Sequence, residues 1–394
     1  MTGAAARAWI AGLDILGMRF GLERIRALLA TLGHPERSGR ALHIVGTNGK
    51  SSSARLAAAA LGSQGPRAGA YLSPHIVDWT ERIQIGGAPV SEERFGAAVG
   101  AVHRAAAGLD LPGGDAVTQF EALTAAAFVA FRDAGVEAWA IEAGLGGRYD
   151  ATNVLPGAAV ALTNVALEHT DLLGDTEAAI AAEKLAVCPD GSDRLVVGPL
   201  TPAARDAVTA ECARRRLRPI RHGAELWASG QGDRVRVVTP LRAYDDLPLA
   251  VRGAFQRDNL AVALAGAELV LGGPLDPGPL RDALRAVRIP GRLEVVAGEP
   301  LTVLDGAHNP AGMEAMAASL PGVVGDRRPV AAVVSVLGDK DAAAMTRRLS
   351  RAVGLVVATR SSHARAASPE RLAELARAAG TPARVAPEPA AALA

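Results

Sequence analysis

Cysteine is scarce in this chain of 394 residues, which contains only Cys188 and Cys212. The two lie far apart and form no C-x-x-C pair. The sequence therefore argues against a disulfide framework and against a thiolate metal site. Both thiols fit the reducing environment of the cytoplasm.

Long apolar runs and a strong charge bias are also missing. No uncharged apolar run approaches the roughly 18 residues that a membrane span requires, and the first twenty residues lack the pattern of a signal peptide. The formal net charge is +1, which gives no sign of a nucleic-acid-binding or membrane-binding protein. The basic run at 214–218 is interpreted as a solvated helix face, with an anion-binding patch as the alternative. We expect a cytoplasmic monomer whose partners are small molecules.

Lysine is almost absent. Of 42 basic residues, 39 are arginine and three are lysine: Lys50, Lys184 and Lys340. An ammonium group is a compact point charge or, when neutral, a reactive primary amine, and a guanidinium supplies neither. The three positions are therefore candidates for functional roles, with chance survival as the alternative.

Short apolar runs alternate with helical patterns over most of the chain. This alternation predicts an α/β fold with a parallel sheet covered by helices on both faces. Residues 234–239 alternate polar and apolar side chains, which predicts a small antiparallel patch beside it. The predicted strands cover residues 41–46, 136–142, 158–164 and 194–198, and the predicted helices residues 50–61, 118–132 and 176–187.

The chain is too long for one ordinary core, which predicts two domains. A turn pattern, I-P-G-R-L at 289–293, precedes a second alternation of strands and helices. We expect a nucleotide-binding parallel-sheet domain over 1–291 and a smaller, Rossmann-like α/β domain over 292–394. In the second domain the predicted strands are 302–305, 329–337, 354–360 and 383–386, and the predicted helices 310–319, 341–352 and 369–379.

A glycine-containing loop lies between the first strand and the first helix of the main alternation. It reads Gly46-Thr47-Asn48-Gly49-Lys50-Ser51, shorter than the usual G-x-x-x-x-G-K-[ST] loop. Backbone N–H groups at a helix N-terminus bind phosphate, the lysine adds a charge, and the serine hydroxyl can reach a metal ion. The pattern favours a nucleotide site over an ordinary turn.

The shortened loop is the form found in the Mur-ligase clan of ADP-forming amide ligases. Further short motifs narrow the resemblance to the folylpolyglutamate synthase/dihydrofolate synthase family. They occur in the order found in that family and cover nearly the whole chain. They are S-P-H at 73–75, E-R-I at 81–83, T-Q-F-E at 118–121, E-A-G-L-G-G-R-Y-D-A-T-N at 142–153, E-H-T-D at 168–171, L-G-D-T at 173–176, E-K at 183–184, P-G-R at 290–292, D-G-A-H-N-P at 305–310 and G-D-K-D at 338–341.

The resemblance implies an ATP-dependent ligase that joins glutamate to the carboxylate of folate or dihydropteroate. ATP phosphorylates the carboxylate, and the amine of glutamate then displaces the phosphate. Such chemistry depends mainly on positioning and charge neutralisation. The resemblance also implies two Mg²⁺ ions and a monovalent cation.

By resemblance, Ser73, Glu142 and His169 contact the metal. Their structural alternatives are a turn, a solvated strand end and a hydrogen-bonded histidine. Lys50 and Lys184 join Glu142 and His169 as catalytic residues. The family carbamylates the lysine at position 184, which requires a neutral primary amine; the alternative is an unmodified lysine paired with a phosphate or with a neighbouring carboxylate.

The remaining expected contacts also follow from the resemblance. Asn259, Arg292 and Asp305 match nucleotide contacts, although a helix cap and a strand-end carboxylate are alternatives for Asn259 and Asp305. Lys340 faces a glutamate carboxylate or pairs with an adjacent aspartate. The full set of expected substrate-binding residues is Thr118, Gln119, Phe120, Glu121, Tyr149, Asp150, Ala151, His308 and Lys340.

Three other functions are alternatives to this one. A Mur-clan amide ligase acting on a different acid would share the loop, Glu142, His169 and Lys184. A GTPase switch typically carries N-K-x-D, and this chain has no Asn-Lys pair. An inactive binding protein would not need the charged motif residues. Ser51 and Phe255 depart from the family's usual glycine and histidine, so the acid substrate and the number of activities stay open.

Overall fold

The computed structural model describes residues 1–13, 21–111 and 115–393, which form two compact units. Unit 1 comprises Met1–Ala250 and Gln256–Arg288, and unit 2 comprises Val251–Phe255 and Ile289–Ala394. Each unit has a hydrophobic core of its own.

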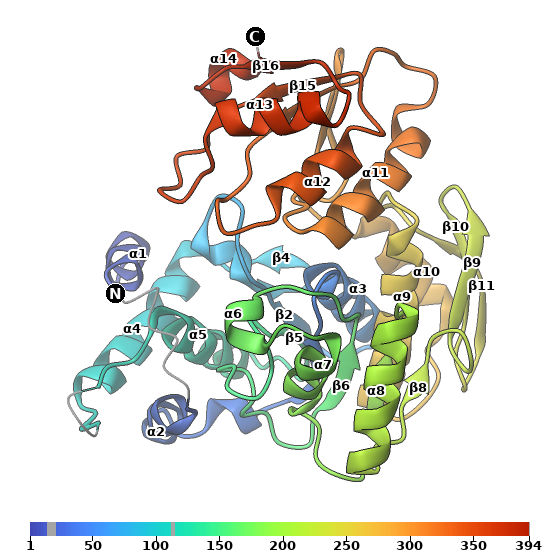
Figure 1. Ribbon diagram of the computed structural model, residues 1–394. Helices are drawn as coiled ribbons and strands as arrows, with labels where there is room; N and C mark the ends of the chain where they lie inside the picture. The colour runs from blue at the N-terminus through green and yellow to red at the C-terminus, as the bar shows by residue number, and fades with distance from the viewer. Residues whose placement is uncertain (14–20, 112–114, 394) are drawn as a thin grey trace. The chain divides into compact units, whose positions relative to one another are not determined.

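A sheet of eight described strands forms the centre of unit 1, in the order β4-β3-β2-β5-β1-β6-β7-β8 (Figure 1). The pairs from β2 through β8 are parallel, whereas β3 pairs antiparallel with β2 and β4. The four predicted strands are confirmed as β1, β5, β6 and β7. The bounds are β1 Arg40–Val45, β2 Ala68–Tyr71, β3 Ile83–Ile85, β4 Ala88–Pro89, β5 Ala138–Glu142, β6 Ala159–Leu162, β7 Leu195–Val197 and β8 Ile220–Arg221.

Helices cover both faces of this sheet, as predicted. α3 packs on β1, β2 and β5, and α9 approaches the same face through Gly266, next to Leu42. The other face carries α5, α7 and α8. The helices of unit 1 are α1 Gly3–Ala11, α2 Glu23–Thr31, α3 Lys50–Ser63, α4 Glu92–Ala107, α5 Gln119–Asp133, α6 Thr170–Leu173, α7 Glu177–Leu185, α8 Pro202–Arg215, α9 Phe255–Leu271 and α10 Pro277–Ala286, with short 3₁₀ turns η1 Pro35–Arg37 and η2 Trp79–Arg82.

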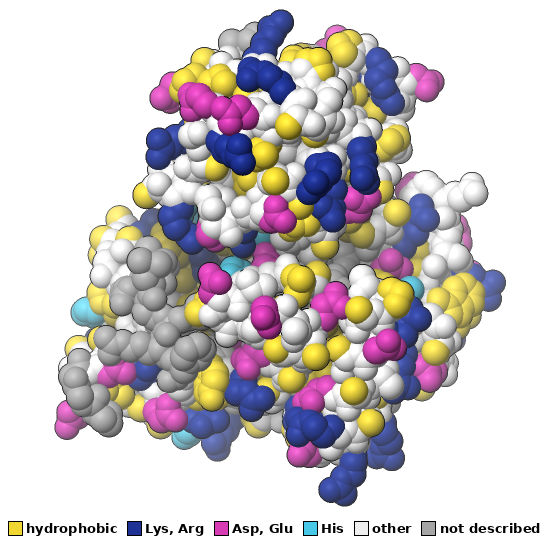
Figure 2. All heavy atoms as spheres, viewed as in Figure 1, with side chains coloured by type: hydrophobic (Ala, Val, Ile, Leu, Met, Phe, Trp, Pro, Cys, Tyr) yellow, Lys and Arg dark blue, Asp and Glu magenta, His cyan; other side chains and the backbone are white. Residues whose placement is uncertain are grey.

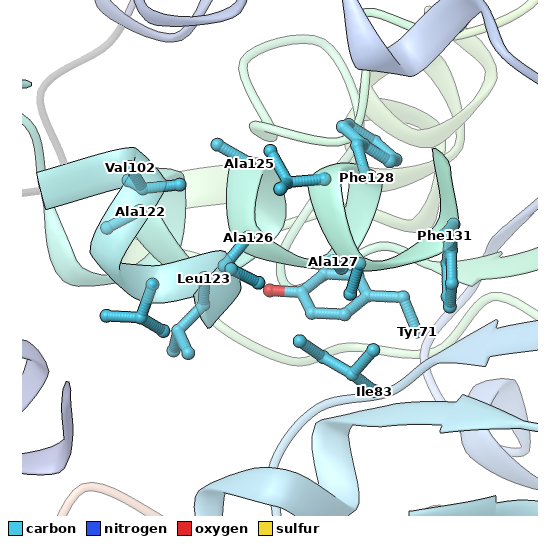
Figure 3. Packing of buried hydrophobic residues seen from close by; sticks show 14 of the residues in the cluster. Tyr71, Ile83, Val102, Ala122, Leu123, Ala125, Ala126, Ala127, Phe128 and Phe131 are labelled. Atoms are coloured by element: carbon cyan, nitrogen blue, oxygen red, sulfur yellow. The ribbon is translucent and has the colours of Figure 1, made fainter. Parts of the chain in front are cut away.

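The α5 face of the sheet holds a large hydrophobic cluster. Ala126 and Ala127 of α5 lie beside the ring of Tyr71 of β2, and Ile83 of β3 lies on the opposite side of that ring (Figure 3). The ring of Trp139 lies between Phe128 and Phe131, with ring-centre distances of 5.7 and 5.6 Å. This rigid layer supports the strands whose ends carry the candidate site.

The predicted antiparallel patch is confirmed as a three-stranded sheet in the order β11-β10-β9. Its strands are β9 Trp227–Gln231, β10 Arg234–Val238 and β11 Ala243–Pro248. The Tyr244 hydroxyl donates to the buried Glu268 carboxylate of α9 at 2.5 Å, and the Thr239 hydroxyl donates to the same oxygen at 2.9 Å. These bonds attach the patch to unit 1.

Unit 2 contains a parallel sheet in the order β14-β15-β16, as predicted, but the predicted strand at 302–305 does not join it. That segment is β13, which pairs antiparallel with β12 across a tight turn at 299–300. Helices α11, α12 and α13 pack together over a methionine- and leucine-rich core. The bounds are β12 Glu294–Gly298, β13 Leu301–Leu304, α11 Pro310–Val324, β14 Ala331–Val334, α12 Ala342–Leu349, β15 Leu355–Ala358, α13 Pro369–Ala378, β16 Ala383–Val385 and α14 Pro389–Leu393.

The surface carries both signs of charge. In Figure 2 basic and acidic side chains are interspersed over the visible face, in agreement with the near-zero net charge. The basic run at 214–218 is largely ion-paired, since Arg214, Arg215 and Arg218 contact acidic side chains. Only the first two residues of the run belong to a helix, because α8 ends at Arg215 and Arg216 caps it, so the predicted helix face does not extend over 216–218. Among the described helices, none has the length and apolar character needed to cross a bilayer.

Candidate active site at the carboxyl ends of the parallel strands

The glycine loop joins β1 to α3 and is shaped by two glycines. Gly46 and Gly49 have φ angles of 146° and 82°, which favour glycine. A Cβ atom on Gly46 would overlap the Thr163 side chain, and one on Gly49 would overlap the Asn259 amide. The first N–H groups of a helix have no intrahelical acceptor, and no side chain caps those of α3. The geometry fits phosphate binding.

A polar segment after β6, which sequence reasoning missed, holds this loop. The Asn48 N–H donates to the Asn164 side-chain oxygen at 2.9 Å, and the Thr163 hydroxyl donates to the Asn48 carbonyl at 2.7 Å. The Thr47 hydroxyl donates to Ala166 O at 3.2 Å. The available signal was the T-N pair directly after an apolar strand, because neighbouring parallel strands end at the same edge of a sheet.

Two lysines converge on the loop. Lys50 Nζ donates to the carbonyls of Gly46 and Thr47, both at 3.1 Å, and Lys184 Nζ donates to the Gly46 carbonyl at 2.9 Å. Lys184 is 3% exposed. Burial and, to a smaller extent, the nearby charge of Lys50 lower its pKa, the carboxylates around it oppose this shift, and the resulting pKa is about 7. A substantial fraction of this amine is therefore neutral near pH 7.

Three oxygen-bearing residues meet beside the loop. The Ser51 hydroxyl donates to one oxygen of Glu142 at 2.8 Å, and the Ser73 N–H donates to the other oxygen at 2.9 Å. Glu142 is the last residue of β5 and is 2% exposed, while Ser73 follows β2. A buried carboxylate with neighbouring hydroxyl groups fits the hard-oxygen preference of Mg²⁺.

His169 is the residue before α6 and has a left-handed backbone, with φ 51°. Its side chain is 36% exposed, and its Nε2 lies 3.9 Å from the Glu168 carboxylate. Within the described ranges, no three His, Cys, Asp or Glu side chains are placed to hold a metal ion together. A Mg²⁺ ion bound beside Glu142 would therefore also need ligands such as hydroxyl groups, phosphate oxygens or water.

The side chains of segment 118–121 mainly stabilise unit 1. Thr118 and Glu121 form a reciprocal capping box at the start of α5, and Glu121 also accepts from Arg24 Nε at 3.1 Å. Gln119 donates to the Ile10 carbonyl at 2.9 Å. Phe120 lies against Gly144, where a Cβ atom would overlap its ring. Of these four expected substrate contacts, Phe120 is the one that packs on the 144–153 loop.

The second expected substrate segment, 149–151, belongs to this loop. Asp150 is 6% exposed, and its carboxylate accepts from Leu145 N at 2.8 Å and Thr152 N at 3.0 Å. Burial raises the pKa of this carboxyl group, while these hydrogen bonds lower it. Tyr149 is 48% exposed and Ala151 is buried. Tyr149 is thus the open member of the segment, and Asp150 organises the loop.

The remaining candidates divide between the two units. In unit 1, the Asn259 amide lies beside Gly49 and donates to Gln256 at 2.9 Å. In unit 2, the Asp305 carboxylate accepts from Leu293 N at 2.9 Å and Ala307 N at 2.8 Å, and burial raises its pKa.

Arg292, His308 and Lys340 are also in unit 2. Arg292 donates to Gly291 O at 2.9 Å, and His308 Nδ1 lies 2.9 Å from Gly306 O. Lys340 lies between Asp339, which pairs with Arg365, and Asp341, which caps α12.

A cavity of about 430 Å³ lies elsewhere in unit 1, beside α2, η1 and the 153–155 segment. None of the predicted site residues lines it. The candidate site is therefore defined by the converging strand ends rather than by this cavity.

Comparison with known proteins gives a consistent result. Residues 291–394 match the family described as "Mur ligase, glutamate ligase domain". The chain is 37% identical to the dihydrofolate synthase/folylpolyglutamate synthase of Mycobacterium tuberculosis, over 89% of this chain and 76% of that protein. It is 36% identical to the folylpolyglutamate synthase of Lacticaseibacillus casei, over 84% of this chain and 79% of that protein.

Solved structures agree. The M. tuberculosis folylpolyglutamate synthase complexed with ADP superposes with a TM-score of 0.91 at 33% identity, covering 99% of this chain and 90% of that one. A folylpolyglutamate synthase–AMPPCP–folate complex gives 0.85 at 32% identity, with coverages of 100% and 98%. The bifunctional enzyme of Yersinia pestis, complexed with AMPPNP and a manganese ion, gives 0.84 at 30%, with coverages of 100% and 91%.

Proposed function

Because this chain belongs to the folylpolyglutamate synthase/dihydrofolate synthase family, we propose that it joins L-glutamate to the carboxylate of folate or dihydropteroate and converts ATP to ADP. The observation that carries the proposal is the convergence of Ser51, Ser73 and Glu142 beside a glycine-shaped phosphate loop. Relatives of this family have been crystallised with ADP, with folate and with a divalent metal ion.

ATP would bind with its phosphates on residues 46–51. The N–H groups at the start of α3 and the Lys50 ammonium would neutralise phosphate charge. For that, Lys50 must exchange its bonds to the loop carbonyls for phosphate oxygens. Asn259 would lie next to the nucleotide, since it contacts the loop. Arg292 and Asp305 are proposed as nucleotide contacts from the second domain.

Ser51, Ser73, Glu142 and His169 would hold Mg²⁺, with two ions in the complete site. When bound, Mg²⁺ neutralises phosphate charge and helps to orient the phosphates for transfer. The buried Glu142 carboxylate supplies the negative charge at this place, while Ser51 and Ser73 N–H fix its orientation.

The reaction then has two steps. A carboxylate oxygen of the pterin acid attacks the γ-phosphorus of ATP, the bond to the β-phosphate oxygen breaks, and ADP leaves. The amine of glutamate attacks the resulting acyl phosphate, an amide forms, and inorganic phosphate and a proton are released. The chain's contribution is to hold two anionic reactants in line and to offset their charge.

Lys184 is proposed to carry a carbamate. Its amine is buried against the loop, and its lowered pKa leaves neutral amine available to react with carbon dioxide. The modification replaces a cation by an anion close to the proposed metal ligands. An unmodified ammonium that binds phosphate is the competing possibility.

The proposed substrate positions rest on which side chains are accessible and on the family match of residues 291–394. Phe120 and Tyr149 offer aromatic surface for the pterin acid, with Thr118, Gln119, Glu121, Asp150 and Ala151 shaping its surroundings. Glutamate is proposed to bind the 292–394 domain through His308 and Lys340, because residues 291–394 match a glutamate ligase domain. A monomer, a monovalent cation and a cytoplasmic location complete the proposal; the buried free thiols of Cys188 and Cys212 are consistent with that location.

ADP release by the purified chain tests the proposal. ATP, Mg²⁺ and glutamate should yield ADP only when dihydropteroate or tetrahydrofolate is added, and mass spectrometry should show the matching glutamyl amide. Parallel assays with the two acids decide between one activity and two. Turnover with another carboxylic acid alone would instead indicate the second candidate, a Mur-clan ligase of different specificity, and no coupled turnover with any acid would refute both.

A further inference from the structure

His43 is a polar residue in the middle of the central strand β1. It is 2% exposed, and its neighbours Leu42 and Ile44 are fully buried. Burying an imidazole without a hydrogen-bond partner is costly, so a buried histidine on this strand requires a specific explanation. Alternation along the strand turns His43 away from Leu42, the residue that meets α9.

The explanation is a chain of three buried side chains. His43 Nε2 lies 2.7 Å from the Thr152 hydroxyl, which donates its single hydrogen to Asp150. With the hydroxyl hydrogen directed to Asp150, the tautomer that completes the hydrogen bonds carries its proton on Nε2 and donates it to Thr152. Burial lowers the pKa of His43 to about 4, so the ring is neutral at physiological pH. The chain runs from imidazole N–H to hydroxyl to carboxylate.

Asp150, at the end of this chain, orders the loop that follows β5. It accepts from two backbone N–H groups, those of Leu145 and Thr152, and its own carbonyl accepts from Asn153 N at 2.8 Å. The same loop carries Tyr149, the exposed aromatic candidate for substrate contact. Two residues beyond His43, β1 ends, and the phosphate loop begins at Gly46.

We propose that His43 and Thr152 are positioning residues that hold the 144–153 loop in the shape that receives the pterin acid. The proposal rests on the proposed function above. Neither side chain would touch the reacting atoms; both would act through Asp150. Loss of these hydrogen bonds should therefore weaken binding of the acid and leave ATP binding and phosphoryl transfer almost unchanged.

Steady-state kinetics with a matched set of variants tests this role. His43→Leu and Thr152→Val each break the hydrogen bonds between His43, Thr152 and Asp150, and His43→Gln restores a donor at a similar position. Removing the chain should raise KM for the pterin acid about tenfold, while kcat and KM for ATP stay within about twofold. His43→Gln should return the KM for the acid to within about threefold of wild type. Tyr244→Phe, which removes a buried hydrogen bond in the antiparallel patch, should leave all three constants unchanged.

Hydrogen–deuterium exchange of the free protein gives an independent readout. Amides of segment 145–153 should exchange faster in His43→Leu and Thr152→Val but not in Tyr244→Phe. This result does not require turnover, so it separates failure of the loop role from failure of the proposed function. Unchanged protection of the loop, or equal rises in KM for ATP and for the acid, would overturn the proposal.

Discussion

Lys50 and Lys184 reach the same backbone oxygen, the carbonyl of Gly46, from different elements. Two ammonium groups at one acceptor repel each other, and this repulsion adds to the burial that lowers the pKa of Lys184. The pair is therefore poised for two different roles. The more accessible Lys50 suits a phosphate charge, whereas the buried Lys184 suits a reaction that needs neutral amine.

Replacement of Lys50 by alanine should reduce ADP formation by about 100- to 1,000-fold, the scale expected for loss of a donor that neutralises transition-state charge. The fold should persist because Lys50 is only half-buried and bonds only to its own loop. A coupled ADP assay and a circular dichroism melt measure the two effects. Near-normal turnover would refute the phosphate-loop assignment.

Lys184→Arg should be nearly inactive although it keeps the positive charge, since a guanidinium forms no carbamate. In the wild type, the neutral amine fraction rises as pH increases through about 7. The carbamate signal in ¹³C NMR with labelled bicarbonate should therefore grow over this range and be absent from the variant. Normal activity of Lys184→Arg would reject the carbamate role.

The lowered pKa of Lys184 also makes the stability of the fold depend on pH. A buried ammonium destabilises the fold when it is charged, so unmodified Lys184 imposes its full penalty below about pH 7. That penalty falls as pH rises from about 7 towards the ordinary value of 10.5, because the unfolded chain binds more protons in this window.

At the scale of elements, the site is a set of strand ends. β1, β2, β5 and β6 lie side by side in the sheet, and the residues that follow them supply the phosphate loop, Ser73, the 144–153 loop and Asn164. Adjacent parallel strands bring their carboxyl ends to one edge, so residues far apart in sequence become neighbours. The loop between β1 and α3 fits there because its two glycines accept conformations and contacts that a Cβ atom would prevent.

Gly49→Ala should raise KM for ATP by more than about tenfold, because the added methyl group meets Asn259 in a backbone conformation that alanine disfavours. Gly33→Ala is a matched control: its φ of 76° is similar, and no atom lies within 4 Å of the added group. The control should lose about 1 kcal/mol of stability and keep its kinetics. Equal kinetic effects in both variants would mean that backbone strain alone is responsible.

At the scale of the whole molecule, two units with separate cores are expected to unfold in two steps. A nucleotide that binds only the folded state stabilises it by about 2.7 kcal/mol at a concentration of 100 Kd. A non-hydrolysable ATP analogue should therefore raise the unfolding temperature of unit 1, measured by calorimetry. Removal of Mg²⁺ with EDTA should abolish most of this increase. In the Glu142→Gln variant, the analogue should give only the small increase seen with EDTA, even when Mg²⁺ is present. A shift that is independent of metal would contradict the proposed role of Glu142.

Sequence pattern predicted the strands of the main sheet that form contiguous apolar runs, and it did not predict β2, β3, β4 or β8. β2 reads A-G-A-Y and β8 reads I-R, so neither forms an apolar run like A-V-A-L of β6 or L-V-V of β7. The segment at 302–305 was correctly predicted as a strand, but its partner was not, because pairing depends on the turn at 299–300. Among the site residues, Thr118 and Glu121 illustrate a different limit: the T-x-x-E string marks a helix cap as well as a family motif, and the structure shows the cap.

The sequence by itself determined the phosphate loop, the α/β class and the family, since glycine spacing, apolar alternation and ordered motifs are local properties of the chain. Only the tertiary structure decided that Lys184 lies buried against Gly46, that Ser51 and Ser73 share the Glu142 carboxylate, and that His43 supports Asp150. These contacts join segments separated by up to 138 positions. They arise from strand order and burial, which set the surroundings, and hence the chemistry, of each side chain.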